Sequence, residues 1–184
     1  AAQSGHMISV GYDLYLKLLE EAVLEERGEK PEQRAECAAD LAVSANIPES
    51  YVPSQEQRMD LYRRIALVRS EAEADDLMDE VIDRFGDPPP SVYTLVQVAL
   101  LRSDAGKVGV TDISQKNGCL KFLLAKFDMQ KVSLLYARPE FKGRLKVDAG
   151  AKPGVILRLK SRDHVIEQAR AFVSAWADAR EERA

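Results

Sequence analysis

The chain has 184 residues, of which 46% are hydrophobic and 30% charged, and its formal net charge is −4 at pH 7. This balance is typical of a globular protein with a hydrophobic core, and it excludes a disordered or fibrous chain. The acidic net charge argues against a protein that grips nucleic acid over its whole surface, although a local basic patch remains compatible with it.

The first predicted elements lie before residue 50. Residues 1–7 include Ser4-Gly5-His6-Met7, which resembles a cloning remnant, so we expect residues 8–184 to be native sequence cut from a longer protein. Apolar residues at helical spacing predict a first helix from Tyr12 to about Gly28. Alternation of apolar with polar or small residues from Arg34 to Ile47 predicts one strand, which Pro48 stops.

Three helices are predicted next. Ser54, with Gln57 three residues later, forms a capping-box signature that opens the first of them. The second runs from about Glu71 to Phe85. The third follows the prolines at 88–90, which can lead into a helix but cannot lie deep inside one, and ends at Gly106.

The remaining sequence alternates between strand and helix patterns. Strands are predicted at 108–113, 119–124, 144–147 and 155–160, and Asn117-Gly118 predicts a hairpin turn between the first two. Asp128 is predicted to cap a short helix and Asp163 a last helix, before a frayed end at 180–183. The fold class is therefore α+β, helix-rich with a small, mostly antiparallel sheet. A subdivision near residues 107–110 is left open.

No motif in the sequence indicates catalysis. Phosphate-binding loops, G-x-G-x-x-G and G-x-S-x-G are absent, and Gly106-Lys107 lacks the rest of a Walker loop. His164 is the single native histidine and is best read as a helix-capping or surface residue. Cys37 and Cys119 form no metal-binding or disulfide spacing, which favours a reducing compartment. We therefore expect no catalytic, metal or cofactor site, no enzyme activity in this part, and no membrane span.

Two charged helix faces remain as candidate sites. The helix after Ser54 carries a basic stretch, for which a solvated face paired with neighbouring acids is the preferred interpretation. It consists of Arg58, Arg63, Arg64 and Arg69. The next helix carries acidic residues opposite its apolar side, which consists of Leu77, Met78, Val81, Ile82 and Phe85. These acids are Asp76, Asp79, Glu80 and Asp83. Physical chemistry alone favours a solvated face here too, with a docking strip for a basic partner as the alternative.

The segment Glu80-Val81-Ile82-Asp83-Arg84-Phe85-Gly86-Asp87-Pro88-Pro89 resembles a signature of the C-terminal domain of bacterial transcription-repair coupling factors. Three further blocks resemble that family in the same order, from Val10 to about Gly109. They are Gly11–Tyr15 followed by Leu18–Val23, then Ile47–Pro53, and then Arg58 followed by Leu61–Ile65. Beyond Gly109 only the order of strands and helices agrees.

The resemblance implies a regulatory domain without catalysis. The family's parent protein is an ATP-driven DNA translocase that removes stalled RNA polymerase and recruits nucleotide excision repair in the bacterial cytoplasm. Its last domain packs on a UvrB-like module of the same chain and masks the surface that binds UvrA. The family's E-x-x-D acids face bases of that module, and at this signature they correspond to Glu80 and Asp83.

We therefore expect an intramolecular clamp in which Glu80 and Asp83, with Asp76 and Asp79 nearby, pair with the UvrB-like module. Ile82 and Phe85 are expected to be core residues, and Gly86 the left-handed residue that ends the helix. UvrA and RNA polymerase would then be indirect partners, and DNA would be contacted through the parent's motor domains. The alternative is an accessory domain that contacts DNA with the helix carrying Arg58–Arg69.

Overall fold

The computed structural model describes residues 37–179. Residues 1–7, the predicted helix at 12–28 and the predicted frayed end lie outside the described residues. The chain divides into two compact units. The described part of the first unit is residues 42–103, and that of the second is residues 37–41 and 104–179. None of the helices between residues 37 and 179 combines the length and the apolar character that a membrane span needs.

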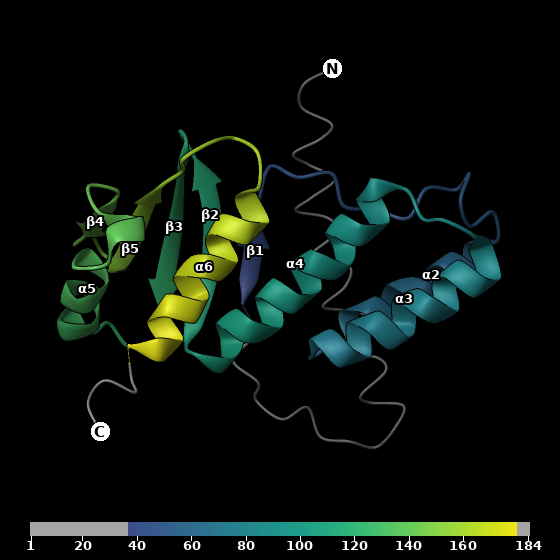
Figure 1. Cartoon of the computed structure of the whole chain (residues 1–184), viewed down its shortest axis with the longest axis horizontal. Coiled ribbons are helices and arrows are strands. Elements are labelled where there is room, and N and C mark those ends of the chain that lie inside the picture. The colour runs from purple at the N-terminus through teal and green to yellow at the C-terminus, as the bar shows by residue number, and fades with distance from the viewer. Residues whose placement is uncertain (1–36, 180–184) are drawn as a thin grey trace. The chain divides into compact units, whose positions relative to one another are not determined.

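The first unit is helical. Helices α2 (Gln55–Ala66) and α3 (Glu71–Phe85) lie alongside each other (Figure 1), and α4 (Pro90–Lys107) begins in this unit. The Ser54 hydroxyl accepts a hydrogen bond from the backbone N–H of Gln57 at 3.2 Å, which confirms the predicted cap. Ser70 caps α3 in the same way through the N–H of Glu73.

The apolar faces of these helices form the core of the first unit. The side chains of Val52, Ile65 and Val92 are fully buried, and Leu77 and Val81 of α3 pack into the same cluster. The side-chain hydroxyl of Tyr62 accepts a hydrogen bond from the backbone N–H of Ile47 at 2.9 Å, which attaches the segment before Pro48 to α2.

The second unit is built on a five-stranded mixed sheet in the order β1-β2-β3-β5-β4. Its strands are β1 (Ala38–Asp40), β2 (Val110–Lys116), β3 (Cys119–Leu124), β4 (Leu145–Asp148) and β5 (Gly154–Arg158). Only β1 and β2 are parallel, and the other pairs are antiparallel. The β2–β3 hairpin turns at Asn117 and Gly118, which both have positive φ, as a two-residue hairpin turn requires. These findings confirm the predicted α+β class.

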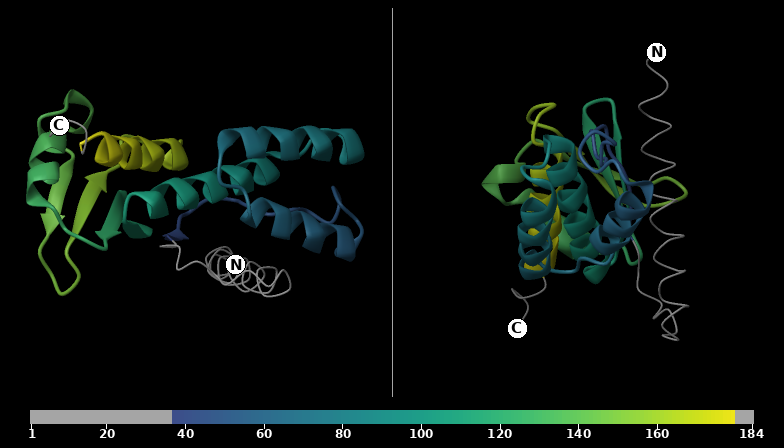
Figure 2. Two further views of the ribbon diagram at one scale, coloured as in Figure 1. Left: turned by 90° about the horizontal axis from the view of Figure 1, so that it is seen from below. Right: turned by 90° about the vertical axis from the view of Figure 1, so that its right-hand side faces the viewer.

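One face of this sheet is covered by helices α5 (Met129–Tyr136) and α6 (Val165–Asp178), as Figures 1 and 2 show. Phe122 of β3 stacks on Phe172 of α6 with ring centroids 4.0 Å apart, and Phe141 meets Phe172 edge-on. Phe141 belongs to η1, a short 3-10 helix (Pro139–Phe141). Asp128 caps α5 as predicted, because its carboxylate accepts hydrogen bonds from the N–H groups of Gln130 and Lys131.

Several predicted boundaries need correction. The strands predicted at 108–113, 144–147 and 155–160 are Val110–Lys116, Leu145–Asp148 and Gly154–Arg158. Of the strand predicted from Arg34 to Ile47, the described part, residues 37–47, forms a strand at Ala38–Asp40 alone, where these residues pair with β2. Helix α4 ends at Lys107 rather than at Gly106. The glycine with a positive φ after this helix is Gly109. Asp163 does not cap α6. His164 occupies the cap position, without a side-chain hydrogen bond.

Gln168 explains the last of these corrections. Its side-chain amide reaches back from the first turn of α6 and donates to the backbone carbonyls of Ser161 and Asp163, at 3.2 and 3.1 Å. Its side-chain oxygen accepts from the N–H of Lys160 at 2.8 Å. The loop before α6 is therefore ordered by a side chain that follows it, which a search for capping residues does not detect.

Candidate functional site

Helix α3 presents an acidic strip on its exposed side, formed by Asp76, Asp79, Glu80 and Asp83. The opposite side of the helix buries Ala74, Leu77, Met78 and Val81. Because residues three and four apart are neighbours on a helix, the four carboxylates form one continuous surface. The structure therefore places all four predicted acids together, facing solvent.

Glu80 differs from the other three acids because it is already paired. The Arg64 guanidinium of α2 donates to both of its carboxylate oxygens, with the Nη1–Oε1 distance at 2.9 Å. The Nη1 atom of Arg84 lies farther away, 3.8 Å from Oε1 of Glu80. The hydrogen bond from Arg64 lowers the pKa of Glu80 below its ordinary value of 4.5, and the same bond raises the pKa of Arg64. Planar, two-point pairing of this kind is the strongest form of an arginine–carboxylate contact.

The remaining three acids are open to a partner. Within residues 37–179 we find no ion pair or hydrogen bond that engages the carboxylates of Asp76, Asp79 or Asp83. Asp79 and Asp83 are four residues apart and repel each other slightly, as like charges at this spacing do. A cation that approached this part of the strip would relieve that repulsion.

The end of α3 differs from the expectation at two residues. Ile82, expected in the core, is 36% exposed at the border of the acidic strip, so that prediction is wrong. Phe85 is partly buried against the core, with its ring edge-on to Tyr51 at 6.0 Å. Gly86 ends the helix with φ 81°, but its ψ of −168° lies outside the left-handed helical region.

Tyr51 fixes this helix end to the segment before α2. Its hydroxyl donates to the carbonyl oxygen of Gly86 at 2.7 Å. Burial, followed by the nearby Tyr93 and Asp87, raises the pKa of the Tyr51 phenol above its ordinary value of 10.0. Two sequence blocks that resemble the family therefore meet through one hydrogen bond.

The predicted basic stretch is largely used inside the first unit. Arg58 donates to the carbonyls of Val52 and Pro53, at 2.9 and 3.0 Å. Arg69 donates to the carbonyls of Ala66 and Val68, at 2.7 and 3.0 Å. Arg64 is bound to Glu80. Of the four arginines in the basic stretch, the exposed Arg63 therefore makes no side-chain hydrogen bond or ion pair within residues 37–179.

The described residues offer no constellation for metal binding. No group of three His, Cys, Asp or Glu side chains between residues 37 and 179 is placed to hold a metal ion. The side chain of His164 is exposed, and its Nδ1 atom lies 3.7 Å from Oε1 of Glu167. Cys37 is buried and Cys119 is half-buried, and both are free thiols.

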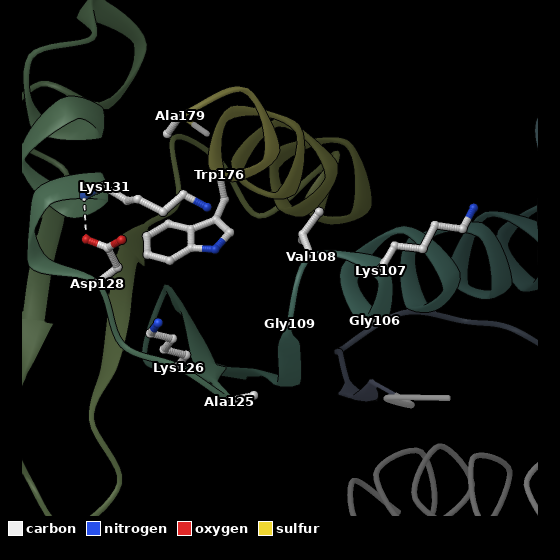
Figure 3. A pocket seen from close by; sticks show the side chains of 10 residues that line it. All are labelled: Gly106, Lys107, Val108, Gly109, Ala125, Lys126, Asp128, Lys131, Trp176 and Ala179. Carbon is white, nitrogen blue, oxygen red and sulfur yellow. Dashed lines mark hydrogen bonds between the residues drawn. The ribbon is translucent and has the colours of Figure 1, made fainter. Parts of the chain in front are cut away.

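A pocket of about 540 Å³ lies within the second unit (Figure 3). Its lining includes the end of α4, the residues that follow β3, the first turn of α5 and the last turn of α6. The Lys131 ammonium lies 4.4 Å from the centre of the Trp176 ring, and Lys131 is only 7% exposed. A cation over an aromatic ring contributes about 2 kcal/mol when desolvated. We therefore interpret the contact between Lys131 and Trp176 as one that stabilises the fold of the second unit.

The comparisons with known proteins agree with this description. The family model of the TRCF domain matches residues 41–133. A transcription-repair-coupling factor of Bacillus subtilis is 35% identical over 138 residues, which cover 72% of this chain and 12% of that protein. The transcription-repair-coupling factor of Escherichia coli is 29% identical over 180 residues, which cover 93% of this chain and 15% of that protein.

A solved structure has the same fold. The crystal structure of a C-terminal domain of transcription-repair coupling factor matches 84% of this chain and all of that chain, with a TM-score of 0.69 and 19% identity. This match confirms the α+β architecture.

The fold and the acidic strip define an α+β domain with an exposed charged helix face and, among the described residues, no metal cluster. The chain belongs to the TRCF domain family. It spans about an eighth to a seventh of the length of these two relatives.

Proposed function

We propose that this chain is the regulatory, non-catalytic domain of a transcription-repair coupling factor in the bacterial cytoplasm. It would clamp the UvrB-like module of the same parent chain and mask the surface that binds UvrA during transcription-coupled repair. The observation that carries this proposal is the exposed face of α3, where Asp76, Asp79 and Asp83 are unpaired within residues 37–179. The family membership supports the role in transcription-coupled repair.

The strip suits a contact that has to open again. Exposed ion pairs contribute little individually, typically about 0–1 kcal/mol, and they weaken with salt. Tethering to the partner raises the effective concentration, so that even a weak contact stays mostly closed. A coupling free energy of about 1–3 kcal/mol is enough to regulate a second binding site.

Asp83 takes the leading role in this clamp and Glu80 a secondary one. An incoming arginine meets Asp83 without competition, but at Glu80 it has to share the carboxylate with Arg64 or displace it. Arg64 also fixes the Glu80 side chain and thereby the strip's geometry on α3. Ile82 gives the border of the strip a small apolar contact that excludes water from nearby ion pairs.

The proposal is tested in the full-length parent by the variant Asp83→Arg. This reversal replaces attraction by repulsion at the clamp, so UvrA binding should rise relative to the wild type. Glu56→Arg is the matched control, because Glu56 is an exposed acid of α2 outside the strip. Unchanged UvrA binding in Asp83→Arg, or an equal rise in the control, would contradict the clamp.

The alternative, DNA binding by the helix with Arg58–Arg69, is weaker on geometric grounds. Three of its four guanidinium groups donate to backbone carbonyls or to Glu80 within the unit. Breaking these bonds to reach phosphates would cost part of the fold's stability. A gel-shift experiment with DNA at low salt, comparing the wild type with Arg63→Glu, tests whether this helix binds DNA.

A further inference from the structure

The two units carry opposite charge. Residues 42–103 contain 11 aspartates and glutamates against 6 arginines and no lysine. Residues 104–179 contain 14 lysines and arginines against 8 aspartates and glutamates. The acidic net charge of the chain therefore hides a basic second unit, and the argument from net charge against nucleic-acid binding does not apply to that unit.

Four of these cations lie on one face of the sheet. The register pairs Lys116 with Cys119 and Cys119 with Arg158, and in the next row Lys121 and Lys146 both lie opposite Ile156. Residues directly opposite in a sheet point to the same face. Lys116, Lys121, Lys146 and Arg158 therefore share the face opposite α5 and α6, and we call them the basic sheet face.

The spacing of the basic sheet face follows from sheet geometry. Neighbouring strands are about 4.8 Å apart and alternate residues along a strand about 7 Å apart, so the four positions, which lie on four successive strands, fit within roughly 14 by 7 Å. Lys116, Lys146 and Arg158 are exposed, and Lys121 is half-buried. The core side of the sheet is filled by Leu120, Phe122, Val155 and Leu157, and so it cannot receive these charges.

Acids are concentrated at the other end of the same face. Asp112 and Asp148 lie in the row of Leu123 and Gly154, one row beyond Lys121. Of the four cations, Lys121 is paired, with its ammonium 2.6 Å from Asp148. No ion pair within residues 37–179 engages Lys116, Lys146 or Arg158. Burial, followed by the positive charge of Arg158, lowers the pKa of the neighbouring Arg144.

We propose that the basic sheet face binds the phosphate backbone of duplex DNA. Duplex DNA presents one negative charge per ~1.7 Å of axis, which suits a compact group of cations. Single-strand binding uses aromatic platforms on which bases stack, and no aromatic residue lies among the described residues of this face. A protein interface would need a buried aromatic or large apolar anchor, whereas this face offers only the half-buried Leu123 and Ile156.

This site is separate from the acidic strip and goes beyond the proposed clamp. It lies in the second unit, and two of its four cations, Lys146 and Arg158, lie beyond the residues matched by the family model. It also differs from the helix with Arg58–Arg69, since Lys116, Lys146 and Arg158 donate no side-chain hydrogen bond within the described residues that would have to be broken.

The test measures fluorescence anisotropy of a labelled 20-base-pair duplex with the whole 184-residue chain. With up to four phosphate contacts, log K should fall with log salt at a slope of about −3 to −4, a loss of about a hundredfold between ~50 and ~200 mM salt. The double variant Lys116→Glu, Arg158→Glu should reduce the affinity at low salt at least about tenfold. It should also make the slope of log K against log salt less negative by about 2.

Lys152→Glu, Lys160→Glu is the matched control, because it makes the same two charge reversals at exposed residues of the second unit outside the basic sheet face. Its affinity should fall less than threefold, and Glu80→Arg, Asp83→Arg should not weaken binding. An equal loss in the two Lys/Arg→Glu variants, or no binding at ~25 mM salt, overturns the proposal. Tighter binding of a single-stranded oligonucleotide, or of polyglutamate, than of the duplex would assign the face to a different ligand and overturn it too.

Discussion

Arg64 binds both carboxylate oxygens of Glu80, whereas Asp83, one helical turn further along α3, has no ion-pair partner within residues 37–179. The two acids of the signature therefore differ in their contacts within residues 37–179. Glu80 connects α3 to α2 and Asp83 is available to a partner. The predictions about the strip follow from this difference.

Replacing Arg64 by glutamine should make the strip more acidic and free Glu80. A basic peptide that binds the strip should bind about two- to fivefold more tightly, as expected for one additional exposed ion pair. The melting temperature should fall slightly, because α2 and α3 lose a two-point contact. Titration of a fluorescent arginine-rich peptide gives the affinity, and weaker binding in Arg64→Gln would show that Arg64 helps the partner.

The stability of the chain should fall on acidification below about pH 4.5. Hydrogen bonds from Arg64 and Lys121 lower the folded-state pKa values of Glu80 and Asp148, whose ordinary values are 4.5 and 3.8. A carboxyl group with a lowered folded-state pKa stabilises the fold above its ordinary pKa, and this contribution is lost as pH falls through the folded-state value. The melting temperature measured from pH 7 to 2.5 should show a steeper acid limb for the wild type than for Glu80→Gln, Asp148→Asn. Parallel limbs would contradict this assignment.

Gly86→Ala should destabilise the first unit by about 1–3 kcal/mol, the usual cost of a residue held in a glycine-only region. The φ of 81° and ψ of −168° at Gly86 strain any other residue, although, apart from Gly86 and its two chain neighbours, no heavy atom of the described residues lies within 4 Å of the position that a Cβ would occupy. The cost is therefore one of backbone conformation and not of collision. Urea denaturation followed by circular dichroism measures it, and a loss below ~0.5 kcal/mol would mean that the turn adapts.

Phe172→Ala should destabilise the second unit by about 3–5 kcal/mol. The Phe172 ring is fully buried and contacts Phe122, Phe141 and Trp176, so its removal leaves a cavity between α6 and the sheet. Phe172→Leu keeps most of the side-chain volume, and its loss of stability should be smaller than that of Phe172→Ala. Similar losses for the two variants would indicate that the ring contacts, and not the volume, stabilise this core.

Much of the fold was predictable because its elements have strong local signals. The caps at Ser54 and Asp128, the span of α3 and the Asn117-Gly118 turn all depend on residues within a few positions of each other. The failures involve partners distant in sequence or specified by side-chain reach. The parallel pairing of β1 with β2 joins segments more than 70 residues apart, and the loop before α6 is held by the side chain of Gln168, with no side-chain cap at the start of α6.

The candidate site was predictable as a set of acids but not in its pairing. Helical spacing placed Asp76, Asp79, Glu80 and Asp83 on one side. It gave no indication that Arg64, sixteen residues before Glu80, would occupy one of them, because that depends on how α2 packs on α3. The exposure of Ile82 was missed for a similar reason, since 100° spacing cannot define where the buried side of a helix ends. The basic sheet face became visible only when strand register was known.

Titration calorimetry of this chain against the UvrB-like module of its parent tests the central claim most directly. The wild type, Asp83→Arg, Glu80→Arg and Glu56→Arg should be compared at low and moderate salt. The clamp predicts salt-sensitive binding that Asp83→Arg abolishes, that Glu80→Arg weakens and that Glu56→Arg leaves unchanged. No binding of the wild type at millimolar concentrations, or binding that Asp83→Arg retains, would contradict it.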